Sequence, residues 1–177
     1  MKFKTDVKTL CITGLLIALA VFLGMIKLFS MPQGGSVTAF SMLPLVLIAY
    51  YYGPAQGMAA GVCAGLLELI LGGFVVHPIQ IIMDYPIAYG VLGVGGLLRN
   101  QNHGLVKGYI LSILCRFFVA SLSGYIFFAS YAPEGFNALV WSIWYNFTYI
   151  AIEGGITIVI LSLPKIRNVL ENLKNQA

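Results

Sequence analysis

Four ionisable side chains lie inside apolar stretches of a chain in which only 9% of the residues are charged: Glu68, Asp84, Arg116 and Glu153. In lipid, such groups are costly and mostly face the protein interior or a water-filled cavity, where they often pair with one another. Arg116 could pair with any of the three carboxylates, and the sequence does not distinguish among them. Asp84, in the segment HPIQIIMDYP (77–86), follows a predicted outer loop within two helical turns. Its carboxylate therefore predicts a pocket that opens outward.

A second cluster, residues 121–149, is rich in aromatic side chains. Trp141, Tyr145 and Tyr149 are spaced by four residues, so on a helix they form one stripe. Asn146 is next to this stripe, and we expect its amide to face inward, away from lipid. Tryptophan and tyrosine also gather at membrane interfaces, which accounts for part of the aromatic density without any ligand.

A carboxylate, an amide and aromatic faces together suit a planar heterocycle that is cationic or carries an amino group. Support for an enzyme is weaker, because the sequence has no HExxH, GxSxG or P-loop motif. We predict no catalytic residue, no metal and no cofactor, and we interpret His77 and His103 as interfacial. The remaining catalytic hypothesis is an intramembrane carboxylate pair, formed by Asp84 with Glu68 or Glu153.

The elements that must position these residues are transmembrane helices. Hydrophobic residues make up 59% of the 177 residues, and the mean hydropathy is +0.91. This composition predicts an all-α integral membrane protein with a single domain (1–177). Six apolar stretches are each near the roughly 20 residues that cross a bilayer. We predict spans at 9–29, 37–52, 54–73, 78–98, 107–130 and 138–163, with a tight turn between the second and third.

Basic residues indicate the orientation of these six spans. Six crossings place both termini on one side, and the positive-inside rule assigns that side to the cytoplasm. Eight basic residues would then be inside, against Lys27 alone outside: Lys2, Lys4, Lys8, Arg99, Lys107, Lys165, Arg167 and Lys174. The tail (165–177) reads as a polar, mildly amphipathic helix, either a solvated helix end or a docking element. We explain the net charge of +4 by this topology, and nucleic acid is not expected as a partner.

Gly14 and Ala18 form a small-xxx-small pair in the first span. Four residues are about one helical turn, so the pair lies on one face and lets another helix approach closely. Packing inside the bundle and docking of another membrane protein are both open from spacing alone.

Four motifs in order along the chain resemble the thiamine-specific S component of energy-coupling factor (ECF) transporters of Gram-positive bacteria. They are MPQGGSV (31–37), HPIQIIMDYPIAYG (77–90), SGYIFFASYAPEG (123–135) and YNFTY (145–149). The resemblance implies a substrate-binding subunit in the bacterial plasma membrane, with six spans and cytoplasmic termini. It would bind thiamine on the outer face.

The same resemblance implies partners and moving parts. The partners are a transmembrane coupling subunit and two ATP-binding cassette subunits, whose ATP hydrolysis drives toppling of the S component in the membrane. Gly14 and Ala18 match the motif that docks on the coupling subunit. The loop between the first two spans, here Gln33, Gly34, Gly35 and Ser36, corresponds to the family's lid.

The resemblance also assigns site residues. Asp84 takes the place of the family's acidic pyrimidine-binding residue, which is often glutamate. Tyr85 follows it as in the family, and Asn146 matches the asparagine of the family's sixth helix. Gly124 belongs to the third motif. Three positions depart from the family pattern: Ala120 replaces a histidine, Phe128 a tryptophan of some members, and Trp141 a tyrosine. These departures leave thiamine, a precursor such as hydroxymethylpyrimidine, or another small vitamin as the predicted ligand.

Overall fold

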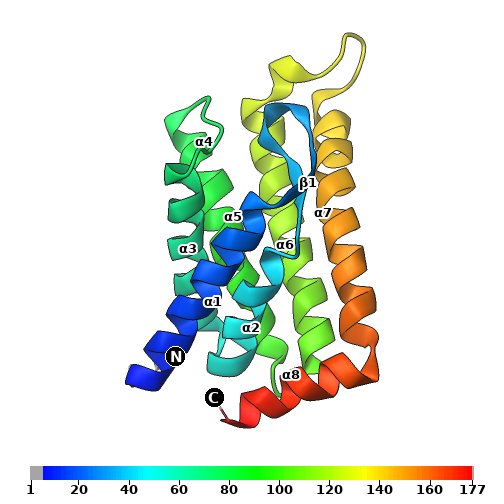
Figure 1. Cartoon of the computed structure of the whole chain (residues 1–177). Helices are drawn as coiled ribbons and strands as arrows, with labels where there is room; N and C mark the ends of the chain where they lie inside the picture. Colours follow the sequence, from blue (N-terminus) through cyan, green and yellow to red (C-terminus); the bar gives the residue numbers. More distant parts are fainter. Residues whose placement is uncertain (1–5, 177) are drawn as a thin grey trace.

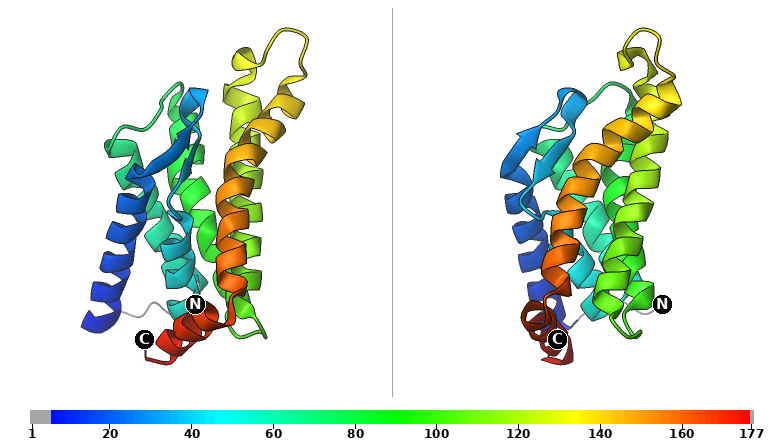
Figure 2. Two further views of the ribbon diagram at one scale, coloured as in Figure 1. Left: turned by 45° about the vertical axis from the view of Figure 1, so that its right-hand side comes forward. Right: turned by 90° about the vertical axis from the view of Figure 1, so that its right-hand side faces the viewer.

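The computed structural model describes residues 6–176, with side chains described as far as Lys174. Helices run side by side along one long axis, with a small hairpin at one end and a short helix across the other (Figures 1 and 2). Within the described residues, four helical segments are long and apolar enough to cross a membrane: α1 (Val7–Met25), the run from Pro78 to Leu98, α6 (Gly104–Phe127) and α7 (Ala138–Ser162). The prediction of a mostly helical membrane protein is confirmed.

Two shorter apolar helices complete the bundle, α2 (Met42–Tyr52) and α3 (Pro54–Ile70). Ten of the eleven residues of α2 are buried, as expected for a helix that is apolar on every side. Gly53, with φ of 102°, reverses the chain between the two helices, and Pro54 opens α3. The tight turn predicted there is confirmed.

The segment between α1 and α2 differs most from the sequence prediction. The predicted spans 9–29 and 37–52 extend too far, because α1 ends at Met25 and α2 begins at Met42. The four later spans agree with the observed helical segments to within three residues at each end. The residues between α1 and α2 form an antiparallel hairpin with a short 3-10 turn at its tip: β1 (Lys27–Ser30), η1 (Pro32–Gly34) and β2 (Ser36–Thr38).

This hairpin follows from its turn residues. Pro32 has no N–H to continue a helix, and Gly34 adopts φ of 90°, which is costly for other residues. The chain therefore turns back, and Phe29 pairs opposite Val37. Backbone groups that would have extended two helices are satisfied across the hairpin instead.

The run from Pro78 to Leu98 is not a regular α-helix. Pro86 lies inside a π-helical turn, where its ring and missing N–H interrupt the α-helical hydrogen bonds. The run divides into α4 (Pro78–Ile82), the π-helical turn η2 (Met83–Ile87), α5 (Ala88–Gly90) and the 3-10 stretch η3 (Val91–Leu98). Asp84 is therefore in a locally widened turn, a feature frequent at functional sites.

Glycines fix this run against its neighbours. A Cβ at Gly93 would collide with the backbone nitrogen of Met58 in α3, and a Cβ at Gly95 would collide with the carbonyl oxygen of Gly108 in α6. The three segments thus pack backbone against backbone, with no side chain between them at these points. The helical wall that carries Asp84 is held from two sides.

The chain ends in α8 (Pro164–Gln176), which lies across the end of the bundle opposite the hairpin (Figure 1). The Lys174 ammonium donates to the Arg99 carbonyl at 2.5 Å and lies 4.5 Å from the centre of the Tyr50 ring. Arg167 contacts His103 Nδ1 at 2.9 Å. The predicted tail helix is therefore docked on its own bundle rather than projecting as a solvated end. Burial lowers the pKa of Lys174, and the nearby Arg99 charge lowers it further.

Candidate ligand-binding site

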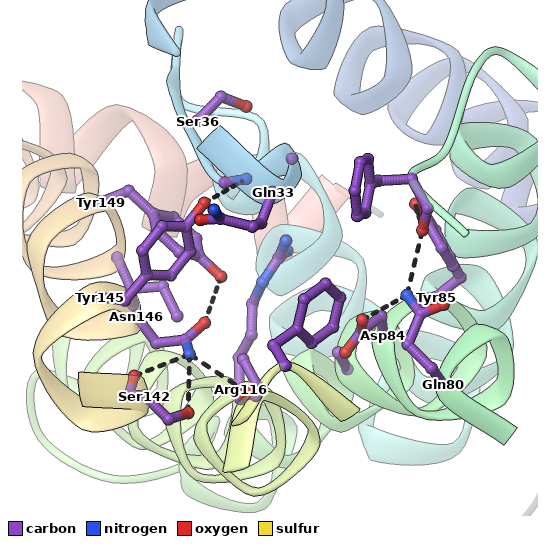
Figure 3. A pocket seen from close by; sticks show the side chains of 18 of the residues that line it. Gln33, Ser36, Gln80, Asp84, Tyr85, Arg116, Ser142, Tyr145, Asn146 and Tyr149 are labelled. Carbon is purple, nitrogen blue, oxygen red and sulfur yellow. Dashed lines mark hydrogen bonds between the residues drawn. The ribbon is translucent and has the colours of Figure 1, made fainter. Parts of the chain in front are cut away.

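A cavity opens between the hairpin, the Pro78–Leu98 run, α6 and α7 (Figure 3). Its lining includes each residue predicted from the sequence as a ligand contact or a lid residue: Gln33, Gly34, Gly35, Ser36, Asp84, Tyr85, Ala120, Gly124, Phe128, Trp141 and Asn146. These positions are up to 113 residues apart in the chain (Gln33 to Asn146) and come from four separate segments. The fold brings them together around one space.

One wall of the cavity carries Asp84. The buried Gln80, one helical turn earlier, donates from Nε2 to Asp84 Oδ2 at 2.6 Å. Gln80 is itself fixed, because it also donates to the Phe74 carbonyl at 3.1 Å and accepts from the Val76 N–H at 3.1 Å. A neutral amide orients the carboxylate without neutralising it. The charge of Asp84 therefore remains available to a ligand that brings a donor.

Tyr85 is a second polar residue on that wall. Its hydroxyl donates a hydrogen bond to the Phe74 carbonyl at 3.2 Å. Gln80 and Tyr85 thus both bind Phe74, which lies in the loop between α3 and α4. This loop and the Phe74 ring at its centre were not predicted as part of the site. Gln80 lies within the second motif and was not predicted as a site residue, although its i,i+4 spacing from Asp84 is the spacing of helical neighbours.

The opposite wall carries Asn146. Its side chain is 5% exposed, which confirms the prediction that its amide faces inward. Its Nδ2 donates to the carbonyls of Ser142 at 2.9 Å and Ala120 at 3.3 Å, and its Oδ1 accepts from the Tyr149 hydroxyl at 2.7 Å. Asn146 thus joins α6 to α7. A ligand donor would meet the second lone pair of its Oδ1, since the amide hydrogens are already used.

Gly124 permits this junction of α6 and α7. A Cβ there would collide with Ser142 Oγ and lie 3.1 Å from Asn146 Nδ2. The Ser142 hydroxyl in turn donates to the Ser121 carbonyl at 2.7 Å. Gly124 therefore contributes to the site by letting α6 and α7 approach closely, which sets the distance between these two walls.

Aromatic rings flank the cavity on two sides. The predicted stripe on α7 forms, with ring centres 6.4 Å apart between Trp141 and Tyr145 and 6.0 Å apart between Tyr145 and Tyr149. Across the space, Phe128 stacks on Phe74 with centres 6.0 Å apart. Such faces accept a flat ring and favour positive charge above them.

Arg116 also lines the cavity, between the Asp84 wall and the Asn146 wall (Figure 3). Its guanidinium lies over the Tyr89 ring, 4.1 Å from the ring centre, and its Nη1 is buried with no hydrogen-bond partner among the described residues. Over residues 6–174, no carboxylate lies within 4.0 Å of the Arg116 guanidinium. The salt bridge found at that distance joins Arg167 to Glu171 in α8. The hypothesis that Arg116 forms an ion pair is therefore wrong at that distance, and a cation–π contact takes its place.

Of the other two carboxylates, Glu153 lines the same cavity as Asp84, whereas Glu68 does not line it within the described part of the chain. Glu153 is 4% exposed and accepts from Thr38 N (2.9 Å), Thr38 Oγ1 (2.6 Å) and Ser41 Oγ (3.3 Å). Glu68 lies against Gly24 of α1 and, within the described part of the chain, outside the lining of the cavity. Glu153 therefore anchors the base of the hairpin, and these contacts give no support to a catalytic pair with Asp84.

Gly14 and Ala18 lie away from the cavity. Both are exposed on the outer face of α1, and a Cβ built at Gly14 meets nothing within 4 Å. Of the two hypotheses open from the spacing, packing inside the bundle is wrong. The pair forms a smooth, accessible strip on an apolar surface.

Comparison with known sequences places this architecture in context. The chain matches the family described as thiamine transporter protein over residues 10–171. The thiamine transporter ThiT of Bacillus subtilis strain 168 is 33% identical over 166 residues, covering 85% of this chain and 86% of that protein. The thiamine transporter ThiT of Lacticaseibacillus paracasei is 29% identical over 141 residues, covering 70% of each.

Two solved structures share the fold. ThiT from Listeria monocytogenes matches with a TM-score of 0.74 at 23% identity, covering 89% of this chain and 96% of that chain. The S component of a bacterial ECF transporter matches with a TM-score of 0.61 at 22% identity, covering 94% of this chain and 98% of that chain. At such identities the likeness establishes the fold.

Proposed function

This chain belongs to the thiamine transporter protein family, and we propose on that basis that it is the substrate-binding membrane subunit of an ECF-type vitamin transporter. It binds thiamine, or a compound that contains the same pyrimidine, from the outer face of the membrane. The observation that carries the proposal is the cavity itself. Asp84 is held on one wall by the Gln80 amide, forms no salt bridge within 4.0 Å among the described residues, and has aromatic faces flanking the space beside it.

Thiamine offers groups that complement the Asp84 carboxylate and the aromatic faces of this cavity. Its aminopyrimidine carries an exocyclic amine, which can donate to Asp84 in a charge-assisted hydrogen bond. Its thiazolium ring is planar and positively charged, and gains from stacking on aromatic faces. We propose that Asp84, Tyr85 and Asn146 recognise the pyrimidine, while Phe128 and Trp141 flank the second ring. Ala120 and Gly124 provide space and spacing.

The departures at Ala120, Phe128 and Trp141 concern the second ring more than the pyrimidine. Ala120 contributes only a methyl group where the family often has an imidazole, so one polar contact is missing. A pyrimidine precursor without the thiazolium would keep the contact to Asp84 and lose little at these positions. The alternative ligands are therefore such a precursor, or another small vitamin.

We propose that the single domain crosses the membrane six times, with α2 and α3 as its shorter crossings and both termini in the cytoplasm. The described basic residues other than Lys27 and Arg116 support this arrangement. They belong to the start of α1, to the connection from η3 into the first turn of α6, and to α8, and these segments lie at the end of the bundle opposite the hairpin (Figure 2). The exposed strip at Gly14 and Ala18 would dock on the coupling subunit. ATP would be hydrolysed by two cassette subunits, and this chain would need no cofactor.

The test is ligand binding by the purified chain alone in lipid nanodiscs. Both tryptophans, Trp141 and Trp144, are in α7, and Trp141 lines the cavity. We expect saturable quenching of their fluorescence by thiamine. Parallel titrations with hydroxymethylpyrimidine and with a panel of other vitamins rank the candidates. No saturable response to thiamine or to its pyrimidine would refute the substrate assignment.

A further inference from the structure

The tip of the hairpin is bound to α7 mainly through Tyr145, and Thr148 of the same helix adds a weak hydrogen bond from its hydroxyl to the Met31 sulfur at 3.4 Å. The Tyr145 hydroxyl accepts a hydrogen bond from the Gly35 N–H at 3.0 Å and donates to the Pro32 carbonyl. A phenol can do both at once, because its oxygen offers a donor and an acceptor. One hydroxyl therefore holds both sides of the turn that covers the cavity.

The turn fits between two aromatic side chains so closely that it has no room for a Cβ. At Gly35, a Cβ would lie 2.7 Å from the Tyr145 hydroxyl oxygen. At Gly34, where φ is 90°, a Cβ would lie 2.9 Å from the Cβ of Phe74. The tip is thus held between α7 and the loop that also supports Gln80. The hairpin can occupy this closed position only because residues 34 and 35 are glycines.

The base of the hairpin is held separately and more firmly. Two turns along α7 from Tyr145, the buried Glu153 carboxylate accepts from the N–H and hydroxyl of Thr38 and from Ser41. These are charge-assisted hydrogen bonds out of water, whereas the bonds at the tip are neutral and half-exposed. When the hairpin opens, the tip should release first and the base should act as its hinge.

We propose that Tyr145 is the latch of this lid, a positioning residue that holds the hairpin tip closed and thereby sets the residence time of the bound molecule. The inference rests on the proposed function for the identity of that molecule, but the latch belongs to the chain alone. Opening the latch should speed release much more than it changes recognition, because the hydrogen bonds that hold Asp84 and Asn146 do not involve Tyr145.

Release kinetics give the first test. In nanodiscs, thiamine should dissociate from the Tyr145→Phe variant roughly fivefold to thirtyfold faster than from the original chain, which corresponds to two hydrogen bonds of about 0.5–1 kcal/mol each. The association rate should stay within about twofold. Tyr125→Phe is the matched control, because Tyr125 is exposed on α6 outside the cavity lining. Equal dissociation rates in Tyr145→Phe and the original chain would overturn the proposal.

Lid position without any ligand gives the second test, which is independent of the substrate. Spin labels at Ser30→Cys on the hairpin and Leu139→Cys on α7, in a chain whose three native cysteines are replaced by serine, report their separation by pulsed electron resonance. We expect Tyr145→Phe to broaden this distribution toward longer distances. An unchanged distribution refutes the latch, even if thiamine binds. A broadened distribution supports it, even if thiamine does not bind.

A double-mutant cycle separates the latch from a contact between Tyr145 and ligand. Gly35→Ala alone should broaden the same distribution, because the new methyl group meets the Tyr145 oxygen. In the Tyr145→Phe background the 2.7 Å contact with the oxygen is absent and the contacts with two ring carbons at 3.0 Å remain, so Gly35→Ala should add less than it does alone. Additive effects of the two substitutions would contradict the proposal.

Discussion

Asp84→Asn is the substitution that tests the recognition of the pyrimidine most directly. The change is isosteric, so it leaves the packing of the π-helical turn as it is. The new asparagine amide can place either its oxygen or its NH2 group toward Gln80. Because Gln80 Nε2 donates at 2.6 Å to one carboxylate oxygen and Gln80 Oε1 is held by the Val76 N–H, the asparagine oxygen must face Gln80. Its NH2 group then points at the ligand.

The expected loss follows from that orientation. The exocyclic amine of the pyrimidine would meet a donor where it had met a charged acceptor. A charge-assisted hydrogen bond contributes about 1.5–3 kcal/mol, so affinity for thiamine should fall roughly tenfold to 150-fold. Asp84→Glu should retain more of the affinity than Asp84→Asn, since it keeps the charge and adds one methylene of reach.

Equilibrium titration by isothermal calorimetry in nanodiscs measures this difference directly. Glu134→Gln serves as the matched control, because Glu134 is an exposed carboxylate in the loop between α6 and α7 and does not line the cavity. Thermal melting of each variant verifies that it is folded. Affinity of Asp84→Asn within twofold of the original chain would remove Asp84 from the binding site, and with it the central contact of the proposal.

Three further substitutions test the surrounding structure. Gln80→Leu removes the donor that orients Asp84, so we expect thiamine affinity to fall roughly threefold to tenfold by calorimetry, and an unchanged affinity would show that Asp84 needs no such support. Glu153→Gln places an amide NH2 among the donors of Thr38 and Ser41, so the melting temperature should fall by roughly 2–10 °C, and an unaltered melting curve would contradict this anchoring role. Gly14→Leu fills the exposed strip of α1, so it should leave binding intact but abolish thiamine uptake in vesicles that contain the partner subunits. Cys63→Leu adds a leucine to the exposed face of α3 and serves as the control for adding a large apolar side chain to the surface. Full uptake by Gly14→Leu would place the docking surface elsewhere.

Residues that are out of place in an apolar chain were the predictable part of the site. Asp84 and Asn146 are conspicuous because lipid penalises them, and both line the cavity. The residues that support them were harder to predict. Gln80 required attention to helical spacing, whereas Phe74 reaches the site only through the conformation of a loop.

Contacts between distant segments account for the rest. The bonds from Thr38 and Ser41 to Glu153 join positions more than 100 residues apart, and no local pattern encodes such a partner. Arg116 likewise has a partner that no local pattern encodes. The sequence offered three carboxylates as its partner, and in the structure it lies over the Tyr89 ring instead. The turn of the hairpin was predicted as a loop, but residues 27–29 and 37–38 of its strands were predicted as helix ends, because short apolar segments suit either conformation.

The glycine contacts of Gly93 and Gly95 also bear on how such a protein can evolve. No side chain fits where η3 meets α3 and α6, so substitutions there would disturb three segments at once and be eliminated by selection. Ala120 and Trp141, by contrast, face open space and can change in size while the backbone stays in place. We therefore expect lineages that acquire a new substrate to vary along α6 and α7 and to keep the glycines at which η3 contacts α3 and α6.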